Sequence, residues 1–307
     1  MSSSLPITII GGYLGSGKTT LVNHLLRHAN GVRLAVLVND FGDLPIDADL
    51  IEAQEGDVIS LSGGCVCCSY GDDLSLSLQK LQEQEKIPEH IFIEASGVAL
   101  PGAIGNSLSL LRAYQLEGVV VLADAATIVQ SAAEKYIGDT IERQLSDADL
   151  ILLNKLDLIT EVQLVQVHSW LDEHYSHAPC VDAIHGTIEP EILFDIKREN
   201  ARSAQNDEHV HKVSNLFSTV VLKVDQVVDA KALAELLAHR ECNLVRAKGF
   251  VLDKDDCMKT IQVVGRRWSV TDAPVNVRPG IVCISSSVEL DEEKIRTLCK
   301  LERPVTA

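Results

Sequence analysis

The sequence lacks an excess of basic residues. Its 307 residues include 44 acidic and 27 basic side chains, which gives a formal net charge of −17 at pH 7. A general nucleic-acid-binding protein needs clustered Lys and Arg to neutralise phosphates, so this balance argues against such a function. An acidic surface is compatible with metal cations or basic partners, although simple solvation of that surface is the plainer interpretation.

Long apolar runs and a leader-like start are missing as well. No run approaches the roughly 18 consecutive apolar residues that a membrane span requires, and no basic residue precedes Lys18. The start therefore resembles neither a secretory signal nor an Arg-rich transit peptide. We expect a cytoplasmic protein with no membrane or nucleic-acid partner. The composition, 46% hydrophobic and 23% charged, excludes a collagen or a disordered tail.

Apolar runs alternate with helical patterns in the first half of the chain. This order is typical of parallel strands joined by crossover helices. The expected strands are residues 5–11, 33–39, 57–61, 90–95, 117–124 and 149–154. The expected helices are residues 18–27, 72–84, 137–145 and 161–175. The sequence therefore predicts an α/β fold with a doubly wound sheet.

The composition changes near Lys197, where apolar residues become sparse, as in a linker. We expect one domain over residues 1–197, a polar linker over 198–213 and a second, smaller domain over 214–307. In the second domain the expected strands are 216–224, 243–252, 261–264, 268–270 and 281–285, and the expected helices are 229–239 and 290–300. That order predicts an α+β domain.

Residues 12–19 (GYLGSGKT) match the GxxxxGK[ST] pattern of a phosphate-binding loop, between the apolar run ITII and an expected helix. Glycines allow a tight turn in which successive N–H groups point at phosphate oxygens. Lys18 would reach the β- and γ-phosphates, and Thr19 would offer its hydroxyl to Mg²⁺. The predicted phosphate-binding residues are Gly12, Tyr13, Leu14, Gly15, Ser16, Gly17, Lys18, Thr19 and Thr20.

Residues 154–157 (NKLD) follow the apolar run DLILL. The Asp157 carboxylate can accept hydrogen bonds from N1–H and the 2-amino group of guanine, a pair of donors that adenine lacks. Asn154 can meet the other edge of the base, and the stem of Lys155 can cover the ring. These residues predict that the nucleotide is GTP or GDP.

A carboxylate ends another apolar run, in residues 90–97 (HIFIEASG). Many nucleotide-hydrolysing enzymes hold Mg²⁺ or its water at such a position, so we expect Glu94 to share the ion with Thr19. Gly97 is expected to contact the γ-phosphate. The predicted catalytic residues are Lys18, Thr19, Glu94 and Asp40, with Asp40 and Asp43 as candidates for positioning water. For Glu94, a charged strand end at the surface is the alternative.

Three cysteines, Cys65, Cys67 and Cys68, occur together in GGCVCC. Thiolates are natural ligands of Zn²⁺ or Cu⁺, and zinc usually takes four ligands. Three thiols leave one position for water, a carboxylate, a histidine or a partner, which suits metal transfer. Inert buried thiols and a redox sensor are the alternatives. The remaining cysteines are dispersed and are expected to be core or incidental: Cys180, Cys242, Cys257, Cys283 and Cys299.

The ordered segments GGYLGSGKTT, VNDFG, GGCVCC, IEASGVALP and LNKLDL resemble the CobW-type metallochaperone GTPases. These belong with the P-loop GTPases of urease and hydrogenase maturation. Residues 244–250 (LVRAKGF) are similar to a motif of the CobW C-terminal domain. The resemblance implies slow, Mg²⁺-dependent GTP hydrolysis coupled to insertion of a metal, most often zinc, into client proteins. It also implies that Cys65, Cys67 and Cys68 hold the zinc, and that the second domain is ferredoxin-like.

Two departures from the family pattern are visible. Asp40 stands where many members have Glu, and the histidine-rich linker of many members is reduced here to His209 and His211. These two histidines are expected to be solvated linker residues, with loose metal binding as the alternative. Two other functions stay open: a cobalt or nickel chaperone, and a nucleotide-sensing adaptor with a structural zinc. The client and the oligomeric state are not indicated.

Overall fold

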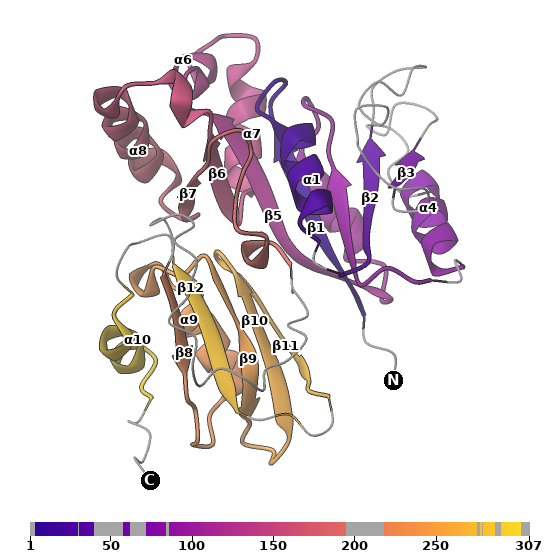
Figure 1. Cartoon of the computed structure of the whole chain (residues 1–307), viewed down its shortest axis with the longest axis vertical. Helices are drawn as coiled ribbons and strands as arrows, with labels where there is room; N and C mark the ends of the chain where they lie inside the picture. Colours follow the sequence, from indigo (N-terminus) through magenta and orange to yellow (C-terminus); the bar gives the residue numbers. More distant parts are fainter. Residues whose placement is uncertain are drawn as a thin grey trace. The chain divides into compact units, whose positions relative to one another are not determined.

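The computed structural model describes residues 4–29, 31–39, 58–61, 72–83, 86–194, 218–274, 277, 279–285 and 290–301 (Figure 1). The chain divides into two compact units, Met1–Leu193 and Phe194–Ala307. Several predictions fall outside the described residues, namely those on Asp40, Asp43, Cys65, Cys67, Cys68, His209, His211 and the linker over 198–213. No helix among the described residues has the length and apolar character needed to cross a membrane.

The first unit contains a seven-stranded parallel sheet with the order β3-β2-β4-β1-β5-β6-β7. Its strands are β1 (Leu5–Gly12), β2 (Leu34–Asn39), β3 (Val58–Leu61), β4 (His90–Glu94), β5 (Tyr114–Asp124), β6 (Leu150–Asn154) and β7 (Cys180–Asp182). Its α-helices are α1 (Lys18–Arg27), α4 (Asp72–Gln82), α5 (Pro101–Leu108), α6 (Ile128–Ala132), α7 (Gly138–Asp147) and α8 (Glu161–Tyr175), and its 3-10 helices are η1 (Leu156–Leu158) and η2 (Pro190–Ile192). The predicted α/β class is confirmed.

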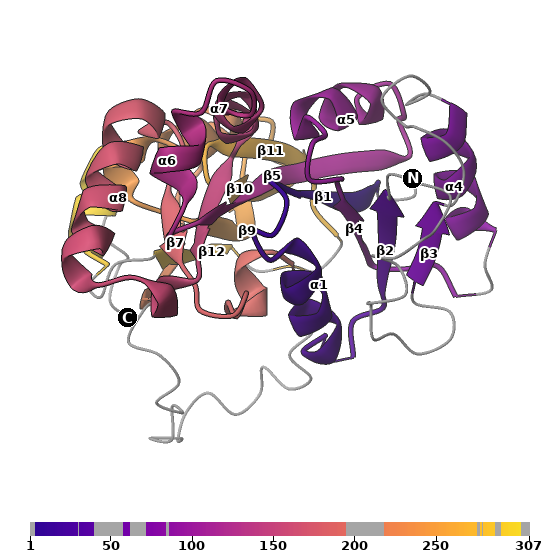
Figure 2. The same cartoon turned by 90° about the horizontal axis from the view of Figure 1, so that it is seen from above.

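Helices cover both faces of this sheet (Figure 2). On one face α1 buries Leu21, Val22 and Leu25. On the other face α4, α5, α7 and α8 share one core with alternate residues of the strands, such as Ile7 and Ile9 of β1. Because both sides of each strand are covered, the strands appear in the sequence as nearly continuous apolar runs. This is why those runs predicted the sheet.

Strand β7, helices α5 and α6 and the 3-10 helices η1 and η2 of the first unit were not predicted. Strand β7 has three residues, too few for a periodic pattern to show. Helix α5 begins with Pro101 and contains Gly102 and Gly105, so its helix propensity is low. Gly105 packs closely on β5, since a β-carbon there would lie 3.0 Å from Leu116 Cδ2. Packing on the sheet, not local propensity, therefore holds this helix.

The second unit contains a five-stranded antiparallel sheet with the order β11-β10-β9-β12-β8. Its strands are β8 (Ser218–Leu222), β9 (Arg246–Leu252), β10 (Met258–Val264), β11 (Arg267–Asp272) and β12 (Gly280–Ser285). Its helices are α9 (Ala230–Leu237), η3 (Arg240–Cys242) and α10 (Glu292–Leu298).

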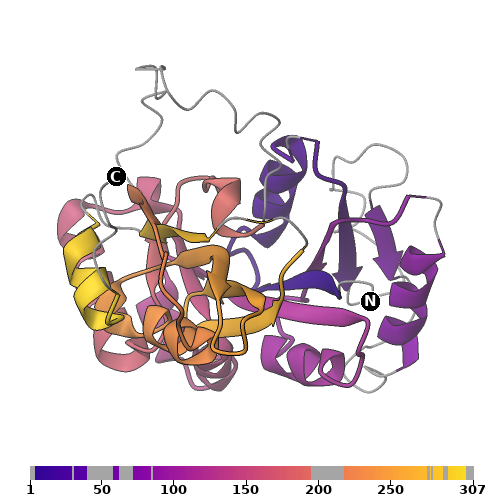
Figure 3. The same cartoon turned by 90° about the horizontal axis from the view of Figure 1, so that it is seen from below.

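Strands β8 and β9 both pair antiparallel with β12, which lies between them, so they run parallel to each other. Helix α9 connects them, which gives the split β-α-β arrangement of a ferredoxin-like domain. Figure 3 shows α10, in yellow, alongside this sheet. Both helices contribute to one core, with Leu233 from α9 and Ile295 from α10. The predicted ferredoxin-like α+β class is confirmed, and the β10–β11 hairpin extends the sheet.

Three of the cysteines expected to be dispersed are neighbours in this core. Cys242, Cys283 and Cys299 are all buried there. A hydrogen bond with Cys299 lowers the pKa of Cys242, and burial raises the pKa of Cys283 to about 12. These thiols are therefore core residues, whereas Cys257 is exposed.

Gly249 of β9 is a site where the second sheet admits no side chain. A β-carbon there would lie 2.0 Å from Gly280 O and 2.5 Å from Ile281 Cα of β12. Both atoms belong to the backbone, so no rotamer change relieves the overlap. We expect Gly249→Ala to destabilise this unit by about 1–3 kcal/mol, as overpacking does. Denaturant unfolding checks this, with Val282→Thr, at an exposed position of β12, as the control. Equal midpoints for Gly249→Ala and the native protein would contradict the β9–β12 packing.

Candidate functional site

The loop between β1 and α1 has the geometry of an anion-binding site. Gly12, Gly15 and Gly17 have φ angles of 129°, 75° and 105°. No side chain of the residues that the structure describes caps the start of α1, which fits a site where its N-terminal N–H groups and positive dipole end meet an anion. The Ser16 hydroxyl is buried and has no hydrogen-bond partner in the described part of the chain. These features fit phosphate oxygens.

Lys18 already points along this loop. Its Nζ donates to Gly12 O at 3.0 Å and to Tyr13 O at 3.3 Å, and the side chain is largely buried. The cation is therefore held beside the loop by carbonyl oxygens. Phosphate oxygens are stronger acceptors for a cation than neutral carbonyls, so a bound phosphate would compete for this Nζ.

Two of the glycines are required by their neighbours as well as by their φ angles. A β-carbon at Gly12 would lie 2.4 Å from Leu122 O of β5, and one at Gly17 would lie 2.3 Å from Asn154 Nδ2 at the end of β6. The loop is thus pressed against the two strands that follow β1 in the sheet. The phosphate loop and the NKLD segment meet in the structure, although more than a hundred residues separate them.

Thr19 and Glu94 also come together. The Thr19 hydroxyl donates to Glu94 Oε1 at 2.8 Å, and Glu94 is only 3% exposed. Strand register explains the contact, because Ile10 of β1 pairs with Glu94 at the end of β4. A hydroxyl and a carboxylate are the hard oxygen ligands that Mg²⁺ prefers, so the pair fits this ion. The alternative interpretation of Glu94 as a surface strand end is wrong.

Gly97 lies against the phosphate loop, since a β-carbon there would be 2.8 Å from Leu14 N. The Gln144 side chain of α7 fixes this segment by donating to Gly97 O at 3.1 Å and to Ala99 O at 2.8 Å. Gln144 is 1% exposed and was not predicted from the sequence. The available signal was a polar residue on the buried face of α7, beside Ile141 and Leu145.

Asn154 has a role that the sequence did not predict. Its Nδ2 donates to Ser16 O at 2.9 Å, and its Oδ1 accepts from Gly186 N at 2.9 Å. The amide therefore joins the phosphate loop to the segment after β7. Its predicted contact with the base edge stays a prediction.

Lys155 is held in an unusual backbone conformation. Its φ is 64°, in the left-handed region, and its Nζ lies 2.7 Å from Asp124 Oδ2 at the end of β5. Asp124 is itself oriented by Ala126 N, which donates to Oδ1 at 3.0 Å. Asp157 follows in η1 and is exposed. Asp124 was missed, although an acidic residue closing an apolar run was the same signal that identified Glu94.

The segment after β7 lies against α1 and forms one wall of the site. His185 and Gly186 have positive φ angles of 54° and 64°, and Ile184 bridges to Thr187. His24 of α1 contacts Ile188 O through Nε2 at 2.8 Å. Burial lowers the pKa of His24, which favours the neutral imidazole that donates from Nε2. This wall was not predicted because β7 was not.

Both units match known protein families. Residues 6–182 match the family described as CobW/HypB/UreG, nucleotide-binding domain. The chain belongs to this family. Residues 217–300 match the cobalamin synthesis protein cobW C-terminal domain, so the predicted resemblance to CobW-type proteins is confirmed over both units.

Relatives of this CobW-family chain include proteins named as zinc chaperones. It is 31% identical over 304 residues to the zinc chaperone CobW of Sinorhizobium sp, with 86% of each chain covered. It is 30% identical over 312 residues to the zinc chaperone YjiA of Escherichia coli strain K12, with 95% of this chain and 96% of that protein covered. A crystal structure of a Zn(II)-bound triple mutant of YjiA GTPase is similar with a TM-score of 0.48 and 26% identity, covering 98% of this chain and 100% of that one.

The Lys155–Asp124 ion pair generates a prediction on base recognition. Asp124→Asn removes the charge but leaves Oδ1 able to accept from Ala126 N. We expect affinity for guanine nucleotides to fall about tenfold, about 1.4 kcal/mol, because the Lys155 stem loses its anchor. Fluorescence competition with GDP and with pyrophosphate checks this. Pyrophosphate affinity, which needs only the phosphate loop, should not change.

The matched control is Asp139→Asn, which breaks the exposed Asp139–Arg143 pair of α7. It should leave both affinities as they are. An Asp124→Asn protein with unchanged GDP affinity would contradict a role for this pair in holding the base.

Proposed function

We propose that this chain is a GTP-hydrolysing zinc metallochaperone, in which the nucleotide state governs binding of Zn²⁺ and its transfer to client proteins. The observation that carries the proposal is the meeting, at one edge of the parallel sheet, of Lys18, the Thr19–Glu94 pair and the Asn154–Lys155 segment. The relatives named zinc chaperones support the choice of metal and client chemistry.

The proposed hydrolytic step depends on charge stabilisation by the phosphate loop. Lys18 exchanges the carbonyl oxygens of Gly12 and Tyr13 for phosphate oxygens and follows the charge that develops on them. Thr19 and Glu94 would hold Mg²⁺, which would supply positive charge against the phosphates. Asp40 is our candidate for orienting the attacking water. Slow intrinsic turnover is expected if metal or client completes this part of the site.

Guanine selection is assigned to the segment after β6. Asp157 is exposed, and its carboxylate would accept from N1–H and the 2-amino group of guanine. The Lys155 stem, fixed by its ion pair with Asp124, would cover the face of the ring. The left-handed φ at Lys155 turns the chain from strand β6 directly into η1, so both residues follow the strand end without a long loop.

The zinc ligands are assigned to Cys65, Cys67 and Cys68, which lie in the sequence between β3 and α4. Strands β3 and β4 are both neighbours of β2, so their carboxyl ends lie about 10 Å apart. Glu94 closes β4, and the chain leaves β3 at the same edge of the sheet. This short separation supports coupling between the metal-binding segment and the nucleotide.

Replacing one carboxylate oxygen of Asp157 by an amide nitrogen should change which base the protein prefers. We expect Asp157→Asn to weaken GTP binding about tenfold or more and to improve binding of xanthosine triphosphate, because the Asn amide can donate to the 2-oxo group of xanthine. Competition binding with GTP, ATP and xanthosine triphosphate measures the change, and Glu161→Gln, an exposed acidic residue at the start of α8, is the control. Equal affinity of the unmutated protein for ATP and GTP would refute the base assignment.

Coupling of nucleotide to zinc tests the function itself. Zinc affinity is measured by chelator competition in three parallel samples, with no nucleotide, with GDP–Mg²⁺ and with a non-hydrolysable GTP analogue. We expect affinity to differ about tenfold or more between nucleotide states, a coupling of about 1.4 kcal/mol or more. Three coincident curves would contradict the chaperone proposal and would favour a structural zinc.

Lys18→Ala supplies the control for this experiment. The variant should lose the effect of nucleotide on zinc affinity while its zinc affinity without nucleotide persists, because Lys18 donates to the phosphate loop, whereas the zinc ligands are assigned to cysteines of another segment. Loss of both properties together would indicate a folding defect, which thermal unfolding detects.

A further inference from the structure

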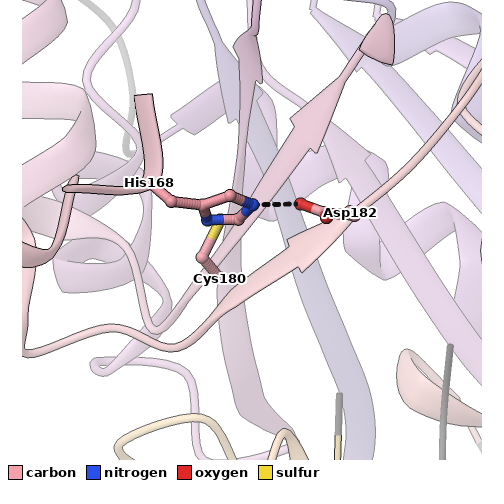
Figure 4. A group of neighbouring side chains, drawn as sticks. All are labelled: His168, Cys180 and Asp182. Carbon is pink, nitrogen blue, oxygen red and sulfur yellow. Dashed lines mark ion pairs between the residues drawn. The ribbon is translucent and has the colours of Figure 1, made fainter. Parts of the chain in front are cut away.

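Three chemically different metal-binding side chains meet at the β7 edge of the parallel sheet in the first unit. His168 extends from α8, and Cys180 and Asp182 extend from the edge strand β7 (Figure 4). One ligand atom from each residue lies within 4.8 Å of the other two. The closest pair is His168 Nε2 and Asp182 Oδ1, at 2.9 Å. All three residues are partly buried.

Regular secondary structure positions these side chains. Cys180 and Asp182 are two residues apart on β7, so they point to the same side, and Val181 between them is fully buried on the other side. Pairing with Ile151 and Leu153 of β6 fixes the register of β7.

Helix α8 is held in place by its N-terminal cap and by packing in the core. At its start, Thr160 and Gln163 form a reciprocal capping box. Next to His168, Val167 and Leu171 are buried in the core. Because both elements are anchored, the three donors are arranged before any ion arrives, which lowers the entropic cost of binding one.

The donor set suits a borderline divalent cation. An imidazole nitrogen, a thiolate and a carboxylate are each ordinary ligands of Zn²⁺, with bonds of about 2.0–2.3 Å in a tetrahedron. Such bonds place the ligand atoms about 3.3–3.6 Å from one another. A tetrahedral site therefore needs His168 Nε2 and Asp182 Oδ1 to move apart by a fraction of an ångström. It also needs Cys180 Sγ, which lies within 4.8 Å of one ligand atom on each of these residues, to move closer to them by rotation of its side chain.

A fourth donor is close to this group. Asp172 is exposed one turn after His168 on α8, at the i+4 position that shares a helix face. The hydrogen bond with Asp182 raises the pKa of His168, and burial raises the pKa of the Cys180 thiol. The charge of Asp172 adds to both shifts. Water or Asp172 would complete a four-coordinate site.

We propose that His168, Cys180 and Asp182 form a second metal site that takes Zn²⁺ or a similar divalent cation, separate from the cysteines between β3 and α4. Binding deprotonates the Cys180 thiol and leaves the imidazole neutral, so protons are released to solvent as the cation enters. The proposal goes beyond the chaperone function, since this ion is held between a helix and a strand of the sheet. A purely structural His168–Asp182 ion pair is the competing explanation, and it gives Cys180 no role.

The test uses Co²⁺ as a spectroscopic substitute for Zn²⁺ in the full chain carrying Cys65→Ser, Cys67→Ser and Cys68→Ser. Removal of these thiols keeps the experiment independent of the chaperone proposal. We expect about one Co²⁺ per chain, with a thiolate-to-cobalt charge-transfer band that Zn²⁺ abolishes by displacement. Adding Cys180→Ser should remove that band, and adding Asp182→Asn should weaken Co²⁺ binding about tenfold or more.

Matched controls are available for two ligands. His174 lies on α8 and is exposed, and Cys257 is an exposed cysteine. His174→Ala and Cys257→Ser should leave the band and the affinity unchanged. Thermal unfolding in a chelator shows whether each variant is folded; if Cys180→Ser is not, His168→Gln and Asp182→Asn carry the test. Absence of a charge-transfer band in the triple-serine protein, its persistence in a folded Cys180→Ser variant, or unchanged affinity in both His168→Gln and Asp182→Asn would overturn the proposal.

Discussion

The carboxamide of Asn154 is the contact that holds the nucleotide-binding edge together. It donates to the phosphate loop at Ser16 O and accepts from Gly186 N, so one side chain joins segments that follow three different strands. Asn154 is 2% exposed, and each of its partners is a backbone group with a fixed position. An unsatisfied buried polar group costs about 1–3 kcal/mol, which makes this residue intolerant of replacement. Gly17 is constrained by the same contact, because any side chain there would occupy the space of the Asn154 amide.

The parallel register of the sheet explains why the other contacts of the site form where they do. Ile10 pairs with Glu94, and Asp124 pairs with Asn154, so the ends of β1, β4, β5 and β6 are level at one edge. The loops that follow these strands therefore begin at the same edge of the sheet. There the Thr19–Glu94 and Lys155–Asp124 contacts each join a residue that ends one strand to a residue that follows its neighbour. The polar groups of the candidate site are thus gathered at one edge of the sheet.

Most of the fold and the main motifs were predictable from local patterns. Helices α1 and α8 begin and end at the predicted residues, because their apolar spacing and the Thr160 cap are local signals. The two strands of the β10–β11 hairpin were expected, but both are longer than predicted. What the sequence did not indicate were contacts between distant segments. Gln144 reaches Gly97 across 47 positions, and Asn154 reaches Ser16 across 138. No periodicity or spacing encodes such pairs.

The His168, Cys180 and Asp182 group illustrates the same limit. Cys180 was expected to be a core or incidental residue because no other cysteine is near it in the sequence. Its neighbours in the group come from a helix and from a strand too short to predict. The distances between these three side chains depend on the register of β7 against β6, which the sequence patterns do not indicate.

The three-residue length of β7 also governs how the sheet ends. β7 forms one edge of the seven-stranded order, where unpaired backbone groups offer a template for another chain. After Asp182 the chain turns away through the left-handed residues His185 and Gly186, and the Ile184–Thr187 bridge closes that turn on itself. A strand this short gives an incoming strand too few hydrogen bonds for stable pairing. The short strand and the turn after it therefore limit edge-to-edge pairing at this side of the sheet.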